Sequence, residues 1–173
     1  TNRAALDREG LIVVGGDGTM SFAKKFIDKG AKRIVGVPKT IDNDLEATDY
    51  TVGFQTAVEV VVGALERLQT TAESHERIMI VEVMGRYAGW IALVAGLAGG
   101  AHVVLIPEIE YDVDAVCAAF HKRHGRGVSS SIVVVAEGEA KKNFAEAEVA
   151  RDRAEKETVR AVKAEGEAKE NLV

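Results

Sequence analysis

The sequence predicts an α/β protein built on a doubly wound, mostly parallel sheet. Short β-branched runs alternate with longer segments of helical period, and most of the short runs are apolar without a break. Unbroken apolar runs are typical of parallel strands that are covered on both faces. The 173 residues are 47% hydrophobic and 28% charged, which is the composition of an ordinary soluble globular domain.

Five apolar runs are expected to form the strands. They are Leu11–Val14, Arg33–Val37, Ile78–Val83, His102–Ile106 and Ile132–Val135. Between them, apolar residues recur at steps of three and four over residues 54–68 and 113–120, which predicts helices. Because parallel α/β proteins bind ligands beyond the carboxyl ends of their strands, the loops after these runs are expected to carry the site.

The composition of the chain changes near residue 139. Residues 1–139 carry the strand–helix alternation and are predicted to form the α/β domain, whereas residues 140–173 are rich in Ala, Glu, Lys and Arg. Glu165 and Lys169 have the favourable i,i+4 order of a helix. Apolar residues in this tail are sparse and keep no heptad, which favours a solvated charged helix over a coiled coil.

Charge and composition exclude several classes of function. The net charge of −5 and the lack of a basic stripe argue against nucleic-acid binding, and no apolar run is long enough to span a membrane. The start of the chain has no apolar signal core, and Cys117 is the single cysteine. We therefore expect a cytoplasmic protein without an intrachain disulfide, and Cys117 is expected to be a small buried apolar residue.

A glycine-rich turn, Gly15–Thr19, directly follows the first apolar run. Glycines at this place let backbone N–H groups approach a phosphate, because no Cβ atoms hold it away. Asp17 cannot bind a phosphate directly, since both groups are negative. Its carboxylate suits the Mg²⁺ that accompanies a nucleotide phosphate.

A second polar cluster, Pro38–Leu45, follows the run Arg33–Val37. Asp42 and Asp44 are two residues apart, so one carboxylate can remove a hydroxyl proton while the other holds a metal. Taken alone, the cluster is equally consistent with an Asx-rich turn. Beside a glycine turn at the same sheet edge, a functional role is favoured.

The third cluster, Glu82–Trp90, follows the run Ile78–Val83. Arg86 is predicted to start a helix, where backbone donors and a guanidinium together can hold a phosphate or sugar oxygens. Tyr87 and Trp90 are expected to be core or subunit-contact residues rather than residues that stack on a ligand.

Together these motifs resemble the 6-phosphofructokinase family. The resemblance covers roughly Leu6–Glu139, and the string Pro38–Asp44 is close to diagnostic of that family. The motifs that carry it, in the order of the family, are Gly15–Thr19, Pro38–Leu45, Thr51–Ala57, Ser74–Arg77 and Glu82–Trp90. The resemblance implies transfer of a phosphoryl group to the C1 hydroxyl of fructose 6-phosphate, in an enzyme of glycolysis.

The resemblance also implies roles for individual residues. Asp42 is the general base, Asp17 and Asp44 hold Mg²⁺, and Arg77 reaches the sugar phosphate of a neighbouring subunit, which implies a homo-oligomer. The turn implied to bind the nucleotide consists of Gly15, Gly16, Asp17, Gly18 and Thr19. The residues implied to contact substrate are Lys39, Thr40, Asp42, Asp44, Arg77, Met84, Gly85, Arg86 and Glu137.

The identity of the phosphoryl donor depends on two positions. Gly18 favours ATP, because pyrophosphate-dependent members tend to carry Asp there, while Lys39 is usual in pyrophosphate-dependent members. We expect ATP, with pyrophosphate as the alternative. Gln69 and His102 stand where regulated bacterial members bind effectors, so regulation of that kind is not expected here.

Parts of the family pattern have no counterpart in the sequence. The family's opening glycine turn is expected upstream of Thr1, and its later sugar-phosphate cations are absent from residues 140–173. Two alternatives from other classes therefore stay open. The chain is then either a non-catalytic fragment or scaffold that keeps the motifs, or a kinase of NAD or diacylglycerol that shares the glycine turn.

Overall fold

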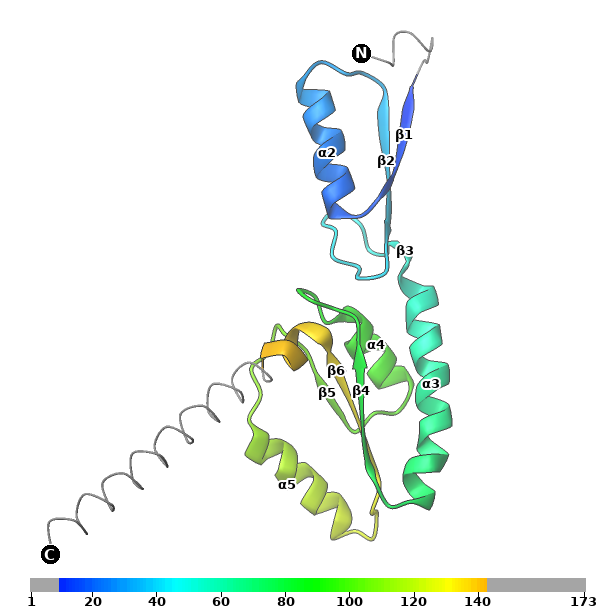
Figure 1. Ribbon diagram of the computed structural model, residues 1–173, viewed down its shortest axis with the longest axis vertical. Coiled ribbons are helices and arrows are strands. Elements are labelled where there is room, and N and C mark those ends of the chain that lie inside the picture. Colours follow the sequence, from blue (N-terminus) through cyan, green and yellow to red (C-terminus); the bar gives the residue numbers. More distant parts are fainter. Residues whose placement is uncertain (1–9, 143–173) are drawn as a thin grey trace, which may run out of the picture.

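The computed structural model of the chain describes residues 10–142. Strands and helices alternate through this part (Figure 1). The strands are β1 (Leu11–Gly15), β2 (Ile34–Thr40), β3 (Val52–Gly53), β4 (Ile78–Val83), β5 (Val103–Leu105) and β6 (Ser131–Ala136). The helices are α2 (Asp17–Asp28), α3 (Phe54–Ser74), α4 (Trp90–Ala98) and α5 (Val113–His124), and residues 137–142 are also helical.

The strands form two parallel sheets, with the orders β1-β2-β3 and β4-β6-β5. The predicted α/β class and the five predicted strands are confirmed, with small differences at their ends. Two features differ from the sequence prediction. The strands divide between two sheets, and the short strand β3 pairs with β2 through Lys39 and Thr40. Two residues are too few for a recognisable period, so β3 carried no signal.

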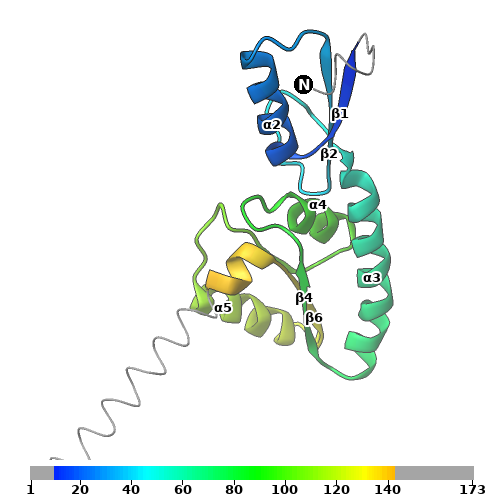
Figure 2. The same cartoon turned by 45° about the horizontal axis from the view of Figure 1, so that its top comes forward.

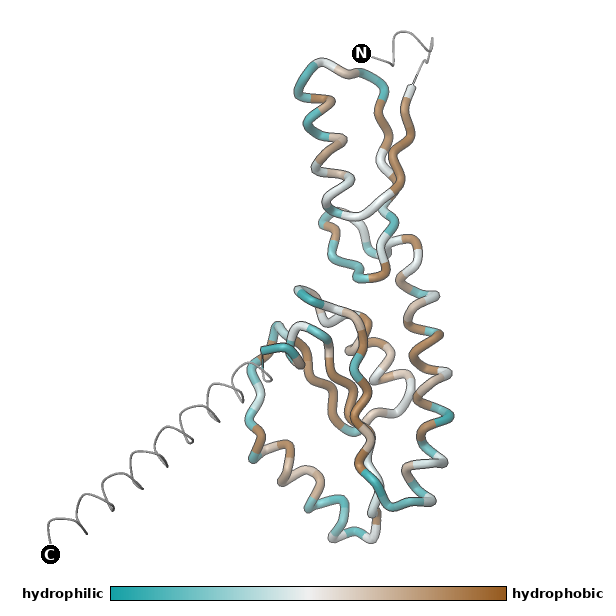
Figure 3. Tube along the Cα trace, viewed as in Figure 1, coloured by the Kyte–Doolittle hydropathy of each residue, from teal (hydrophilic) through white to brown (hydrophobic). Residues whose placement is uncertain are grey.

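In the first sheet, helix α2 covers one face of β1 and β2. A Cβ on Gly36 would lie 2.8 Å from the sulfur of Met20, so the glycine lets α2 approach the sheet closely. Successive strand residues point to opposite faces. The side chains of Ile12 and Val35 remain 70% and 60% exposed. Figure 3 shows that β1 is hydrophobic along its length.

The main hydrophobic core belongs to the second sheet. Every residue of β6 is buried, and α3 and α4 pack against this sheet with Leu65 and Ile91 almost fully buried. Figure 2 shows α3 running along the sheet beside α4. The core anchors β4 and β6, whose carboxyl ends lead directly to Met84 and Glu137.

Helix α5 contributes no buried side chain. It begins at a side-chain cap, in which Asp112 accepts the backbone N–H of Asp114 at 2.9 Å. The expectation of a buried Cys117 is wrong, because the thiol lies on this helix and is exposed.

Of the predicted tail helix, residues 140–142 are helical and the remainder lies outside the described residues. None of the helices in residues 10–142 has the length and hydropathy needed to cross a bilayer.

Candidate active site

The glycine turn joins the end of β1 to the start of α2. Gly16 is the N-cap of α2, and no side chain caps this end of the helix. A Cβ on Gly15 would collide with the side chain of Thr19, so this position requires glycine, whereas a Cβ on Gly18 would meet nothing within 4 Å. The turn therefore offers open space in front of the positive end of a helix.

The loop after β2 lies against this turn. A Cβ on Gly16 would be 3.4 Å from the Cβ of Thr40, and Gly15 is in register with Pro38. The hydroxyl of Thr40 accepts the backbone N–H of Asp42 at 3.2 Å. The structure thus brings two of the predicted clusters together at one sheet edge.

Asp42 lies in a partly buried, negatively charged environment. Burial raises the pKa of its carboxyl above the ordinary value of 3.8, and the neighbouring charges of Asp44 and Glu137 add to the rise. A hydrogen bond with Thr40 acts in the opposite direction. Since Glu137 follows β6 and Asp42 follows β2, the two sheets both contribute carboxylates to this environment.

The loop after β4 is irregular rather than helical. The prediction that Arg86 starts a helix is wrong, because α4 begins four residues later, at Trp90. Gly85 has φ 140°, which a helix does not allow, and its carbonyl accepts the backbone N–H of Gly138 at 3.0 Å. Arg86 is exposed and lies over the ring of Tyr87, with 5.3 Å between its Cζ and the ring centroid.

Glu137 is placed between two cations. Lys141 donates a hydrogen bond to its carboxylate and lowers the pKa of Glu137 below the ordinary value of 4.5, and Arg86 contributes to the same shift. The charged form of the Glu137 carboxylate is therefore favoured. Met84 and Gly85 begin the loop that carries Arg86, so four of the predicted sugar-site residues lie at the carboxyl ends of β4 and β6.

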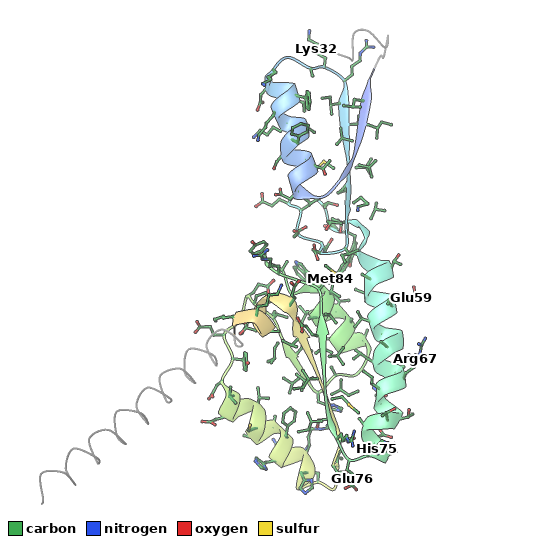
Figure 4. All side chains as sticks on the ribbon, in the orientation of Figure 1. Lys32, Glu59, Arg67, His75, Glu76 and Met84 are labelled. Carbon is green, nitrogen blue, oxygen red and sulfur yellow. The ribbon has the colours of Figure 1, made fainter. Side chains whose placement is uncertain are left out.

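Arg77 lies at the other end of the second sheet. It precedes β4, whereas Met84 follows that strand, and six strand residues span roughly 20 Å. Figure 4 shows the neighbouring His75 and Glu76 far from Met84. Within one chain Arg77 is not brought to the other predicted site residues.

The remaining predicted ligands are accessible to solvent. Lys39, Asp17, Thr19 and Asp44 are exposed, and Asp17 stands in the first turn of α2. Residues 10–142 contain no group of three or more His, Cys, Asp or Glu side chains placed to hold a metal ion. Two carboxylates nevertheless fit Mg²⁺, which is usually held by one or two carboxylates with substrate phosphates and water.

Sequence reasoning missed two residues that hold the Arg86 loop. Glu108 accepts the backbone N–H of Gly89 at 2.7 Å, and a Cβ on Gly138 would collide with the carbonyl of Arg86. Both lie two or three residues after a predicted strand, in the sequences Pro107-Glu108 and Glu137-Gly138. Their position after a strand was the available signal, but a contact with residues far away in the chain leaves no local pattern.

The fold and the site define a parallel α/β protein with paired carboxylates beside a glycine turn. The family model described as Phosphofructokinase matches residues 2–168. The chain therefore belongs to the phosphofructokinase family.

Named relatives and solved structures agree with this assignment. A pyrophosphate–fructose 6-phosphate 1-phosphotransferase from Streptomyces coelicolor is 58% identical over 137 residues, covering 79% of this chain and 40% of the relative. An ATP-dependent 6-phosphofructokinase from Corynebacterium efficiens is 53% identical over 137 residues, covering 79% of this chain and 39% of the relative. Phosphofructokinase from Pichia pastoris in the T-state has a TM-score of 0.73 and 36% identity, covering 80% of this chain and 18% of that one. The chain thus spans about two fifths of the length of these curated relatives.

Proposed function

We propose that this chain carries the phosphoryl-transfer centre of an ATP-dependent 6-phosphofructokinase. The substrates are ATP and fructose 6-phosphate, and the product is fructose 1,6-bisphosphate. The observation that carries the proposal is the environment of Asp42, which lies beside Asp44 and Glu137 next to the glycine turn. Its raised pKa suits a group that accepts a proton during the reaction.

Asp42 acts as the general base. Its carboxylate takes the proton of the C1 hydroxyl as the C1 oxygen forms a bond to the γ-phosphorus. The bond from that phosphorus to the bridging oxygen breaks, and ADP leaves with the electron pair. Phosphoryl transfer needs positioning and neutralisation of charge more than covalent chemistry, so Asp42 is the one base required, and the other residues act by placing the reactants and neutralising charge.

Asp17 and Asp44 would hold Mg²⁺. The ion would neutralise charge on the donor phosphates, which is its usual part in this chemistry. The free N-terminal end of α2 beside Asp17 supports binding of the same phosphates. Thr40 and Gly15–Thr19 would contact the donor.

The sugar would lie against the loop after β4 and the start of the segment after β6. Met84, Gly85, Arg86 and Glu137 would line this part, with the guanidinium of Arg86 as the cation for the phosphorylated sugar. Arg77 lies too far away to serve the same chain's site. We therefore propose that it serves the site of a neighbouring copy in a cytoplasmic homo-oligomer.

Pyrophosphate is the second candidate donor. Lys39 favours it, and the relative from Streptomyces coelicolor is named as a pyrophosphate enzyme. The open space at Gly18 favours ATP, because no side chain there crowds or repels the inner phosphates of a nucleotide. The relative from Corynebacterium efficiens is named as ATP-dependent.

Formation of fructose 1,6-bisphosphate by the purified chain tests the proposal. The assay is run with Mg²⁺ and either ATP or pyrophosphate, and compares the wild type with Asp42→Asn. We expect turnover with ATP, and a fall of about 10²–10⁴-fold in the variant, the usual contribution of a general base. The affinity for the sugar phosphate is expected to change little.

The outcomes separate the alternatives. Turnover with pyrophosphate alone would show that pyrophosphate, and not ATP, is the donor. Nearly full activity in Asp42→Asn would show that another residue is the base. A folded wild-type chain that is silent with both donors supports the non-catalytic alternative, and turnover of NAD or diacylglycerol instead would refute the choice of substrate.

A further inference from the structure

The loop from Ile41 to Thr51 carries both carboxylates of the Asp42–Asp44 pair and returns to the sheet at β3. Thr51, its last residue, is 4% exposed, although its side chain is polar. A buried hydroxyl is unfavourable unless it is hydrogen-bonded, so its partners show what the burial achieves.

Thr51 connects the end of the loop with its beginning. Its hydroxyl donates to the backbone carbonyl of Thr40 at 2.7 Å, directly before the loop leaves the sheet. Its backbone N–H donates to Oδ1 of Asn43 at 2.9 Å, and its hydroxyl lies 3.3 Å from the same oxygen. A single residue thus connects the strand end with the centre of the carboxylate-bearing segment.

Asn43 extends this connection across the loop. Its side-chain amide donates to the carbonyl of Asp49 at 3.3 Å, while its oxygen accepts from Thr51. Asn43 also has φ 53°, in the left-handed region that asparagine tolerates better than most residues. Because it stands between Asp42 and Asp44, its conformation sets the direction of the peptide units that carry both carboxylates.

We propose that Thr51 and Asn43 are positioning residues, which together form a clamp that holds Asp42 and Asp44 in their working arrangement. Neither side chain is assigned a contact with substrate or with the reacting atoms. The inference rests on the proposed function in one respect, since it takes Asp42 to be the base. The existence of the clamp itself depends only on the bonds within the loop.

Four variants of the full chain test the clamp. Thr51→Val removes the hydroxyl and keeps the shape of the side chain, and Thr51→Ser keeps the hydroxyl. Asn43→Gly keeps the left-handed backbone accessible and removes the side-chain bonds. Thr48→Val is the matched control, because the Thr48 hydroxyl donates to the nearby carbonyl of Tyr50 at 3.0 Å in an exposed position.

The first measurement needs no catalysis. Hydrogen exchange of the Thr51 amide is followed by NMR in each folded variant. We expect exchange at least tenfold faster in Asn43→Gly, and a wild-type rate in Thr48→Val. An unchanged exchange rate of the Thr51 amide in Asn43→Gly overturns the clamp. This variant tests the clamp even if Thr51→Val does not fold.

The second measurement separates positioning from general stability. In the ATP assay, Thr51→Val and Asn43→Gly are expected to lower kcat at least tenfold with KM for fructose 6-phosphate within about threefold, as loss of orientation predicts. Thr51→Ser is expected to restore most of kcat. A failure of Thr51→Ser to restore it, or a loss confined to KM, overturns the positioning role.

The proposed function and the clamp can fail separately. If the folded wild-type chain is inactive, the exchange measurement still supports or overturns the clamp, while the proposed function is refuted for this chain. If Asp42→Asn keeps full activity but Thr51→Val does not, the loop is held by the clamp around a different base, and the clamp is supported.

Discussion

At the scale of single residues, the glycines of the site fall into two kinds. Gly15 and Gly138 are required by packing, because an added Cβ would collide with Thr19 or with the carbonyl of Arg86. Gly18 is different, since a side chain there would enter open space. Packing does not explain a glycine at this position, whereas the proposed binding of a donor phosphate does.

Gly18→Asp is therefore expected to alter the choice of donor without unfolding the chain. A carboxylate about 4 Å from a phosphate is opposed by roughly 4 kcal/mol at an effective dielectric constant of 20. Solvent screening reduces this repulsion at the exposed Gly18, so we expect a loss of at least tenfold in ATP affinity. The affinity is measured by calorimetric titration with Mg-ATP. Gly18→Ala, the uncharged control, should bind within about threefold of wild type, and equal weakening in both variants would contradict an electrostatic cause.

At the scale of the elements, the Arg86 loop is held by groups from distant segments. Gly138 after β6 donates its backbone N–H to the carbonyl of Gly85, and the side-chain carboxylate of Glu108 after β5 accepts the N–H of Gly89. The loop therefore depends on the register of the second sheet, where Val83 pairs with Ala136. Its conformation depends on the sheet as well as on its own sequence, since Gly85 has φ 140°.

Gly138→Ala is expected to displace this loop, because the new methyl group must push against the carbonyl of Arg86. Overpacking of this kind costs about 1–3 kcal/mol of stability. We expect a lower thermal unfolding midpoint and about tenfold weaker binding of fructose 6-phosphate, measured by calorimetry. Gly63→Ala in α3 is the control, since its Cβ meets nothing and its helix propensity rises. If Gly138→Ala binds the sugar normally, the loop does not position Arg86 for it.

A histidine joins β5 to β6. His102 donates its backbone N–H to the carbonyl of Ile132 at 2.9 Å, and its Nδ1 accepts the N–H of Ile132 at 2.9 Å. Burial lowers the pKa of His102 below 6.5, and the charge of Arg123 lowers it further. The folded state thus favours the neutral ring, whose Nδ1 can accept a hydrogen bond.

The stability contributed by the neutral ring is present above the unfolded-state pKa of His102 and is lost as the pH falls below it. We expect the unfolding midpoint to fall by a few degrees between pH 7 and pH 5. His102→Asn, whose Oδ1 can accept the same N–H, should reduce this dependence, whereas the control His75→Asn, at the C-cap of α3, should retain it. Parallel pH curves for the two variants would exclude His102 as the origin.

At the scale of the whole molecule, the two sheets differ in how much core they bury. The cluster of buried apolar residues lies around β4, β6, α3 and α4. Helix α2, which covers the first sheet, has Ala23 as its one buried residue. Asp42 is carried by the first sheet and Glu137 by the second. The candidate site therefore joins a well-packed part to a thinly packed one.

Native-state hydrogen exchange is expected to reveal this difference. Regions with few buried contacts open with lower free energy than the core. Amides of β6 should exchange at least tenfold more slowly than those of β1 and β2. The measurement is hydrogen exchange of the full chain by mass spectrometry or NMR, with added Mg-ATP as a second condition. Equal protection of both sheets would show that the first is stabilised in a way that its packing does not reveal.

The sequence by itself determined the α/β class, five of the strands and the three polar clusters that follow strands. It did so because strand period, helix period and glycine turns are local properties that neighbouring residues specify. The assignment of Asp42 as the base and the role of Arg77 came from resemblance, that of Asp17 also from the chemistry of its turn, and all three remain predictions. The beginning of α4 was misplaced, because Gly85 has φ 140° and its carbonyl pairs with Gly138, a contact across the fold that leaves no local pattern.

The tertiary structure alone decided how the clusters meet. The division into two sheets, the exposure of Cys117 and the contacts of Glu108 and Gly138 all depend on pairings between residues far apart in the chain. The same is true of the environment of Asp42, where burial raises the pKa of the carboxyl first, and the charges of Asp44 and of Glu137, 95 residues later, add to the rise. Local patterns cannot specify such pairings, because burial and charge act through space, and their effect depends on which surfaces the fold brings together.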